Sequence, residues 1–163
     1  MVQRCSGDNG VVQYRLGSFI WSEDFDEGIN YWFWLRRAGA TTGMGLVEEV
    51  RQVINQPAFA KHNRLAAESR WEEYLLEWRQ WKRDQSMALI EESRATPATV
   101  TRAHYRAMAA VGLRSLRVQW VMAPFGERWL FPPDIAVLGV EGSTAEQRRR
   151  AVLDAARALL VEP

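Results

Sequence analysis

Residues 58–95 read AFAKHNRLAAESRWEEYLLEWRQWKRDQSMALIEESRA, and this stretch contains neither glycine nor proline. Trp71, Trp78 and Trp81 recur in it at the spacing of helical turns. One helix over the whole stretch would be about 55 Å long at ~1.5 Å per residue. Large rings along a helix need a surface that buries them. The stretch therefore predicts a long helix that is either the spine of the core or a docking face.

The composition is that of one globular domain, which we expect to span residues 1–163. The chain is 47% hydrophobic and 25% charged, close to the average for such proteins. Its net charge of +1 gives no global field that would attract nucleic acid or acidic lipid. The single cysteine, Cys5, excludes an intramolecular disulfide. No apolar leader or membrane-length apolar run is seen, so we expect a cytoplasmic protein.

Local patterns mark the other elements. Alternation of apolar and polar residues over 12–16 predicts an N-terminal hairpin within 1–21. Ser22 is expected to cap a helix over 23–38. Thr96-Pro97 starts a predicted helix over 97–111, and Ser143 with Glu146 forms the capping box of a last helix over 144–161.

Two further elements complete the expected fold. Leu116–Met122 alternates as a strand does, and a turn at 124–127 suggests that it returns as a hairpin over 116–131. A short amphipathic helix is expected over 46–54. Together these elements predict an α+β fold that is mostly helical, with one long central helix packed against several shorter helices and a small antiparallel sheet.

Aromatic residues are the first candidate functional feature. The chain has eight tryptophans, and the run Tyr31–Leu35 places four rings in succession. A helix over this run would be enclosed on several sides, although aromatics also favour strands. Tryptophan packs in protein cores, which is the simpler explanation for the long helix, and it is also concentrated in the hot spots of interfaces. The interface candidates, or the core residues behind an interface, are Trp32, Trp34, Trp71, Trp78 and Trp81.

Arginines are the second candidate feature. No aspartate or glutamate occurs between Ser93 and Gly126. Arginine beside an aromatic ring suits phosphate contact and base stacking. The alternative is that these arginines pair with acids from elsewhere in the fold. The candidates for binding nucleic acid or another anion are Arg102, Tyr105, Arg106, Arg114 and Arg117.

The usual signs of catalysis are missing from the sequence. The chain has two histidines, His62 and His104, and neither belongs to a zinc-binding helix motif. No Cys-x-x-Cys is present, and the glycine-rich loop over 39–45 lacks the lysine of a phosphate-binding loop. We therefore predict no catalytic residue, no metal site and no cofactor. If the protein is an enzyme, His104 and the acids over 23–27 are its most suitable groups.

These observations lead to three functional expectations. The first is a non-enzymatic interaction or assembly protein, a subunit or accessory factor of a larger complex of the kind that phages and mobile elements carry. Its partner is another protein or a second copy, and not a membrane. The alternative is a nucleic-acid-associated protein that uses the arginines over 94–117. The second alternative is a small enzyme with an unrecognised site.

Overall fold

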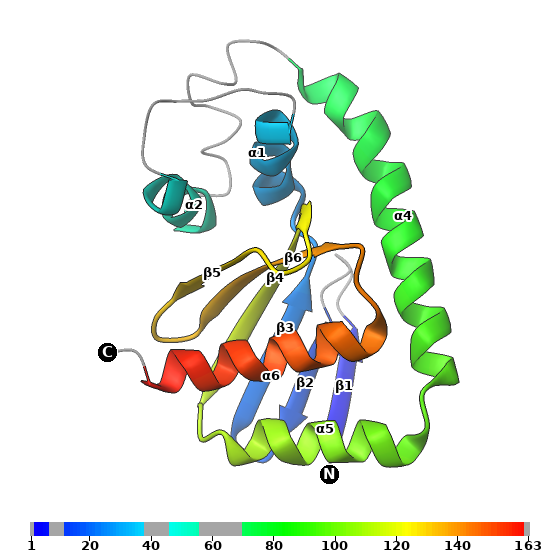
Figure 1. The fold of residues 1–163 in the computed structure, drawn as a ribbon, viewed down its shortest axis with the longest axis vertical. Coiled ribbons are helices and arrows are strands. Elements are labelled where there is room, and N and C mark those ends of the chain that lie inside the picture. Colours follow the sequence, from blue (N-terminus) through cyan, green and yellow to red (C-terminus); the bar gives the residue numbers. More distant parts are fainter. Residues whose placement is uncertain (1, 7–11, 38–45, 56–69, 162–163) are drawn as a thin grey trace. The chain divides into compact units, whose positions relative to one another are not determined.

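The structure is a computed structural model that describes residues 2–6, 12–37, 46–55 and 70–161 (Figure 1). The chain divides into two compact units. The first, the sheet unit, comprises residues 1–25 and 88–163, and the second, the aromatic unit, comprises residues 26–87. The long helix α4, Trp71–Ala95, begins in the aromatic unit and ends in the sheet unit.

The sheet unit contains one six-stranded sheet in the order β1-β2-β3-β4-β6-β5. The pairs β3/β4 and β4/β6 are parallel, and the other three pairs are antiparallel. The strands are β1 Val2–Ser6, β2 Val12–Leu16, β3 Phe19–Asp24, β4 Ser115–Pro124, β5 Arg128–Phe131 and β6 Ile135–Glu141.

Two helices of the sheet unit, α5 (Ala98–Ala110) and α6 (Ala145–Val161), cover one face of the sheet. Tyr14 and Trp21 are opposite each other on β2 and β3, so their side chains share a face. The ring of Tyr105 on α5 lies 5.9 Å from the ring of Tyr14 and 5.5 Å from that of Trp21. Helix α6 packs across β6 on the same side and contacts α5 (Figure 1).

The aromatic unit contains α1 (Glu27–Arg37), α2 (Leu46–Asn55) and the first part of α4. Asp26 caps α1, because its carboxylate accepts a hydrogen bond of 2.9 Å from the backbone N–H of Ile29. The hydroxyl of the fully buried Tyr74 donates to the carbonyl oxygen of Glu27 at 2.6 Å. The rings of Tyr31 and Trp71 meet edge to face with centroids 4.8 Å apart. Aromatic contacts therefore join α1 to α4.

The structure is α+β, but the predicted arrangement, mostly helical with a central long helix and a small antiparallel sheet, is wrong. The sheet is neither small nor antiparallel, since it has six strands and two parallel pairs. The long helix is not central either, because only Tyr74 and Trp78 of its 25 residues are buried. Its predicted segment 58–69 lies outside the described residues. The sequence patterns identified individual strands and the local antiparallel pair β1/β2, but they carried no information about pairs between segments far apart in the chain.

Three local predictions also need correction. The predicted hairpin over 116–131 does not form, because β4 and β5 each pair with β6 instead of with each other. The helix expected from residue 23 begins at Glu27, because β3 extends to Asp24 and pairs with β2 and β4. At α6 the capping box is formed by Thr144 and Gln147. Ser143 instead accepts a hydrogen bond from Arg148.

Candidate interaction surface

Helix α4 has a second apolar stripe on the side that faces away from its buried residues. At ~100° of rotation per residue, Leu76, Met87 and Ile90 lie roughly 160–220° around the helix from Tyr74. These three side chains are exposed by 73%, 54% and 45% respectively. We call them the outer stripe. Arg83 is also exposed and lies on the same side between Leu76 and Met87.

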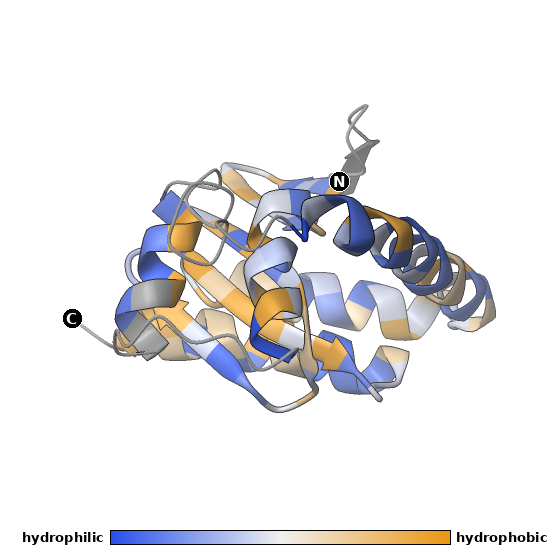
Figure 2. Cartoon of the chain, turned by 90° about the horizontal axis from the view of Figure 1, so that it is seen from above, coloured by the Kyte–Doolittle hydropathy of each residue, from blue (hydrophilic) through white to orange (hydrophobic). Residues whose placement is uncertain are grey.

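The outer stripe has an acidic border along one edge. Four exposed carboxylates lie roughly 260–300° around the helix from Tyr74. No lysine or arginine of α4 occupies that sector, and Figure 2 shows the helix as mostly hydrophilic around its isolated apolar positions. The acidic border consists of Glu73, Glu77, Asp84 and Glu91.

Neighbouring side chains hold part of this border in place. Glu73 forms an ion pair with Arg70 at 3.0 Å, and the hydrogen bond from Arg70 lowers the pKa of Glu73. Glu77 accepts a 2.6 Å hydrogen bond from the indole N–H of Trp34. Asp84 accepts one of 2.8 Å from the side-chain amide of Gln80. Glu73 therefore stays ionised to lower pH than an ordinary glutamate.

The candidate tryptophans lie behind this surface. Trp32, Trp34 and Trp78 are buried, and Trp71 and Trp81 are half-buried. Trp78 stacks on Trp81 with ring centroids 5.3 Å apart. Their assignment to an interface, or to the core behind one, stays a prediction. Sequence reasoning missed the outer stripe, because three apolar residues among many charged ones give a weak periodic signal.

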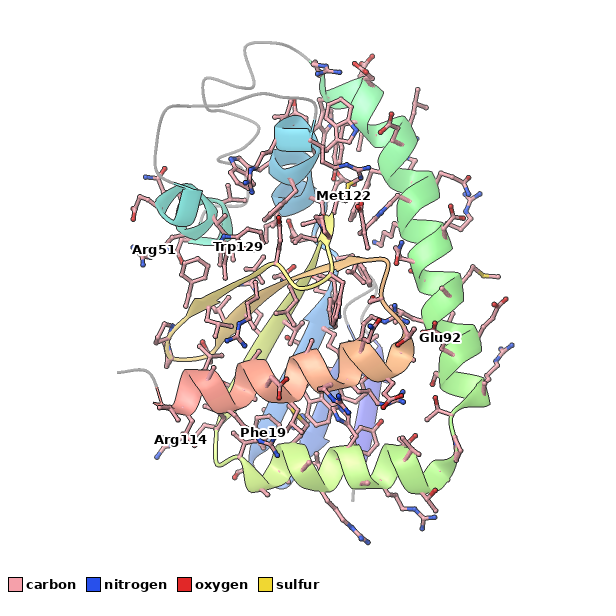
Figure 3. All side chains as sticks on the ribbon, in the orientation of Figure 1. Phe19, Arg51, Glu92, Arg114, Met122 and Trp129 are labelled. Atoms are coloured by element: carbon pink, nitrogen blue, oxygen red, sulfur yellow. The ribbon has the colours of Figure 1, made fainter. Side chains whose placement is uncertain are left out.

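The arginine candidates do not form one strip. Arg102 and Arg106 are exposed one turn apart on α5, and Arg114 is exposed after that helix (Figure 3). Arg117 lies on β4 next to Leu116, whose side chain shares the face of Trp21, so Arg117 points to the opposite face. Tyr105 packs inward on β2 and β3. Only Arg102 and Arg106 therefore remain as a compact basic pair.

A buried charge cluster connects α4, α6 and the sheet within the sheet unit. The Arg148 side chain is 6% exposed and donates to the carboxylate of Glu92, which Figure 3 shows beside the first turn of α6. Arg148 also donates to the carbonyl and hydroxyl oxygens of Ser143, each at 2.9 Å. Its Nε has no hydrogen-bond partner among the described residues. Burial lowers the pKa of Arg148, while the nearby carboxylate of Glu23 raises it.

The carboxylate of Glu23 is hydrogen-bonded to two buried tryptophans. It accepts a hydrogen bond of 3.0 Å from the indole N–H of Trp120 and one of 3.3 Å from that of Trp21. Both tryptophans are almost fully buried. The part of the chain that the structure describes contains no group of three or more histidine, cysteine or acidic side chains arranged to hold a metal ion. The ion pair of Arg148 with Glu92 links α6 to α4, and the hydrogen bonds of Glu23 link β3 to β4.

His104 lies at the edge of this cluster. Its ring meets Trp21 edge to face at 6.3 Å. Burial, followed by the positive charge of Arg149, lowers the pKa of His104 from 6.5 to about 4. His104 is therefore neutral in the folded protein near pH 7.

Lowering the pH should destabilise the protein through His104. The unfolded chain binds this proton near pH 6.5, and the folded chain binds it only near pH 4. The free energy of unfolding therefore has its full value above pH 6.5 and falls as the pH drops toward about 4. The total loss is about 2 kcal/mol after allowance for solvent screening. Denaturant unfolding at a series of pH values measures this change. His104→Gln should flatten the slope in this window; equal slopes in the wild-type protein and in His104→Gln would contradict the assignment.

An open hollow of about 440 Å³ lies between the β4–β5 turn and α6. It contains charges of both signs and was not predicted from the sequence. Its lining residues are Phe125, Gly126, Glu127, Arg128, Leu138, Gly139, Gln147, Arg150, Ala151 and Asp154. None of them belongs to the buried charge cluster, so the hollow and the cluster are separate features.

Among the described helices, none has an apolar segment long enough to cross a lipid bilayer. No protein-family model, characterised protein or solved structure matches this chain.

Proposed function

We propose that this chain is a non-enzymatic interaction and assembly protein that docks a protein partner on the outer stripe of α4. The observation that carries the proposal is the exposure of Leu76, Met87 and Ile90 on the side of α4 that faces away from its two buried residues, Tyr74 and Trp78. Single exposed apolar residues are normal, but three that face one side of a helix over about 21 Å can give a partner three anchoring contacts. Arg83 adds a side chain that is common at interfaces. A subunit of a larger cytoplasmic complex fits this surface.

Sedimentation velocity over a range of protein concentrations tests the proposal. We expect the wild-type protein to self-associate, and the triple variant Leu76→Gln, Met87→Gln, Ile90→Gln to associate at least about tenfold more weakly. The matched control is Leu160→Gln with Val161→Gln, which removes two exposed apolar side chains at the end of α6. The control should associate like wild type. Association that survives unchanged in the triple variant would overturn the proposal.

A further inference from the structure

The outer face of α5 complements the outer stripe of α4 in size. Thr99, Ala103 and Ala110 are exposed and lie roughly 180–220° around α5 from the fully buried Met108. Small side chains at these positions leave shallow depressions in the helix surface. The Leu, Met and Ile side chains of another helix can fill these depressions, as ridges fill grooves when helices pack.

The two faces also complement each other in charge. Arg102 and Arg106 border the small residues of α5, and α5 contains no aspartate or glutamate. The outer stripe of α4 is bordered by four carboxylates, of which Glu73 is paired with Arg70 at the start of the helix. Of the two directions in which α5 can lie along α4, one places the arginine border beside the acidic border. Charge complementarity thus selects one of the two directions in which α5 can run along α4.

The lengths of the two surfaces agree. The outer stripe extends over 14 residue steps from Leu76 to Ile90, which is about 21 Å of helix. Helix α5 has 13 residues, which is about 20 Å. One α5 helix therefore covers the whole stripe.

We propose, on the basis of the proposed function above, that the partner docked on α4 is helix α5 of a second copy of this chain. The contact joins two different surfaces, so each copy offers α4 to one neighbour and α5 to another, or exchanges both contacts within a dimer. The arginine pair predicted from the sequence as an anion site then contacts carboxylates of the neighbouring copy.

A charge-swap experiment tests this assignment. One variant carries Asp84→Lys and Glu91→Lys, and the other carries Arg102→Glu and Arg106→Glu. All four positions are exposed, so both variants should fold, and circular dichroism melts check this. In each variant alone, α4 and α5 carry like charges, and we expect association at least about tenfold weaker than in wild type. Mixed in equal amounts, the variants offer opposite charges at both contacts, so association should return.

The matched control is Arg157→Glu, an exposed reversal on α6 that should leave association unchanged. Normal self-association of the Arg102/Arg106 variant, or no recovery in the mixture, would overturn the α5 assignment. If the triple variant of the outer stripe still loses association in that case, the proposed function stands and only the identity of the docked helix fails. A gel-shift assay with duplex DNA at low salt tests the alternative. If the wild-type protein binds DNA and the Arg102/Arg106 variant does not, while the variant still self-associates, those arginines bind nucleic acid and the assignment is overturned.

Discussion

Replacing Glu92 with glutamine should destabilise the protein by about 2 kcal/mol, because the buried guanidinium of Arg148 would lose a half-buried ion-pair partner while the nearby Glu23 carboxylate remains. The hydrogen bonds of Arg148 to Ser143 remain in this variant, but they supply no negative charge. The loss should appear as a lower midpoint of denaturant unfolding at low protein concentration.

The adjacent Glu91 provides a matched control for this change. Glu91 is exposed, so Glu91→Gln should change stability by less than about 0.5 kcal/mol. A combined variant, Glu92→Gln with Arg148→Met, removes the buried charge together with its partner. It should recover much of the lost stability, because a buried ion pair is often replaced by apolar groups at little cost. Equal stability of Glu92→Gln and Glu91→Gln would contradict the ion pair.

Replacing Glu23 with leucine should cost about 3 kcal/mol. The indole N–H groups of Trp21 and Trp120 both donate to this carboxylate, and both rings are buried. Each donor left without an acceptor costs about 1–3 kcal/mol. Denaturant unfolding followed by tryptophan fluorescence measures the loss.

The conservative variant Glu23→Gln separates hydrogen bonding from packing. Glutamine keeps one acceptor oxygen, so its cost should fall between those of wild type and Glu23→Leu. If Glu23→Leu is as stable as wild type, the two indole hydrogen bonds contribute nothing to folding, and the cluster does not tie β3 to β4.

The buried charge cluster and the outer stripe are connected through α4. Glu92 lies on α4 only two residues after Ile90, so its contact with Arg148 fixes the C-terminal end of the stripe relative to α6.

The sequence predicted those elements whose signals are local. Helix α4 follows from the tryptophan spacing, and α6 follows from a capping sequence at 143–147, although the residue pair that forms the cap differs from the predicted one. Strand β3 was missed because its acidic end resembles a helix start, and pairing with two neighbouring strands outweighs that preference. The order of the sheet was also missed, because parallel pairing depends on segments far apart in the chain.

The candidate site was predicted only in part. Arg102 and Arg106 are a pair because they lie one turn apart on a helix. Tyr105 turns inward because the rings of Tyr14 and Trp21 lie beneath it, and no local pattern reveals them. The outer stripe appears only after Tyr74 and Trp78 define which side of α4 is buried.

Hydroxyl-radical footprinting of the wild-type protein over a range of concentrations tests the docking role of α4 most directly. We predict that oxidation of Leu76, Met87 and Ile90 falls together as the protein assembles, while the exposed Leu160 and Val161 remain equally reactive. Unchanged oxidation of the three stripe residues, at concentrations where sedimentation shows assembly, would contradict the account.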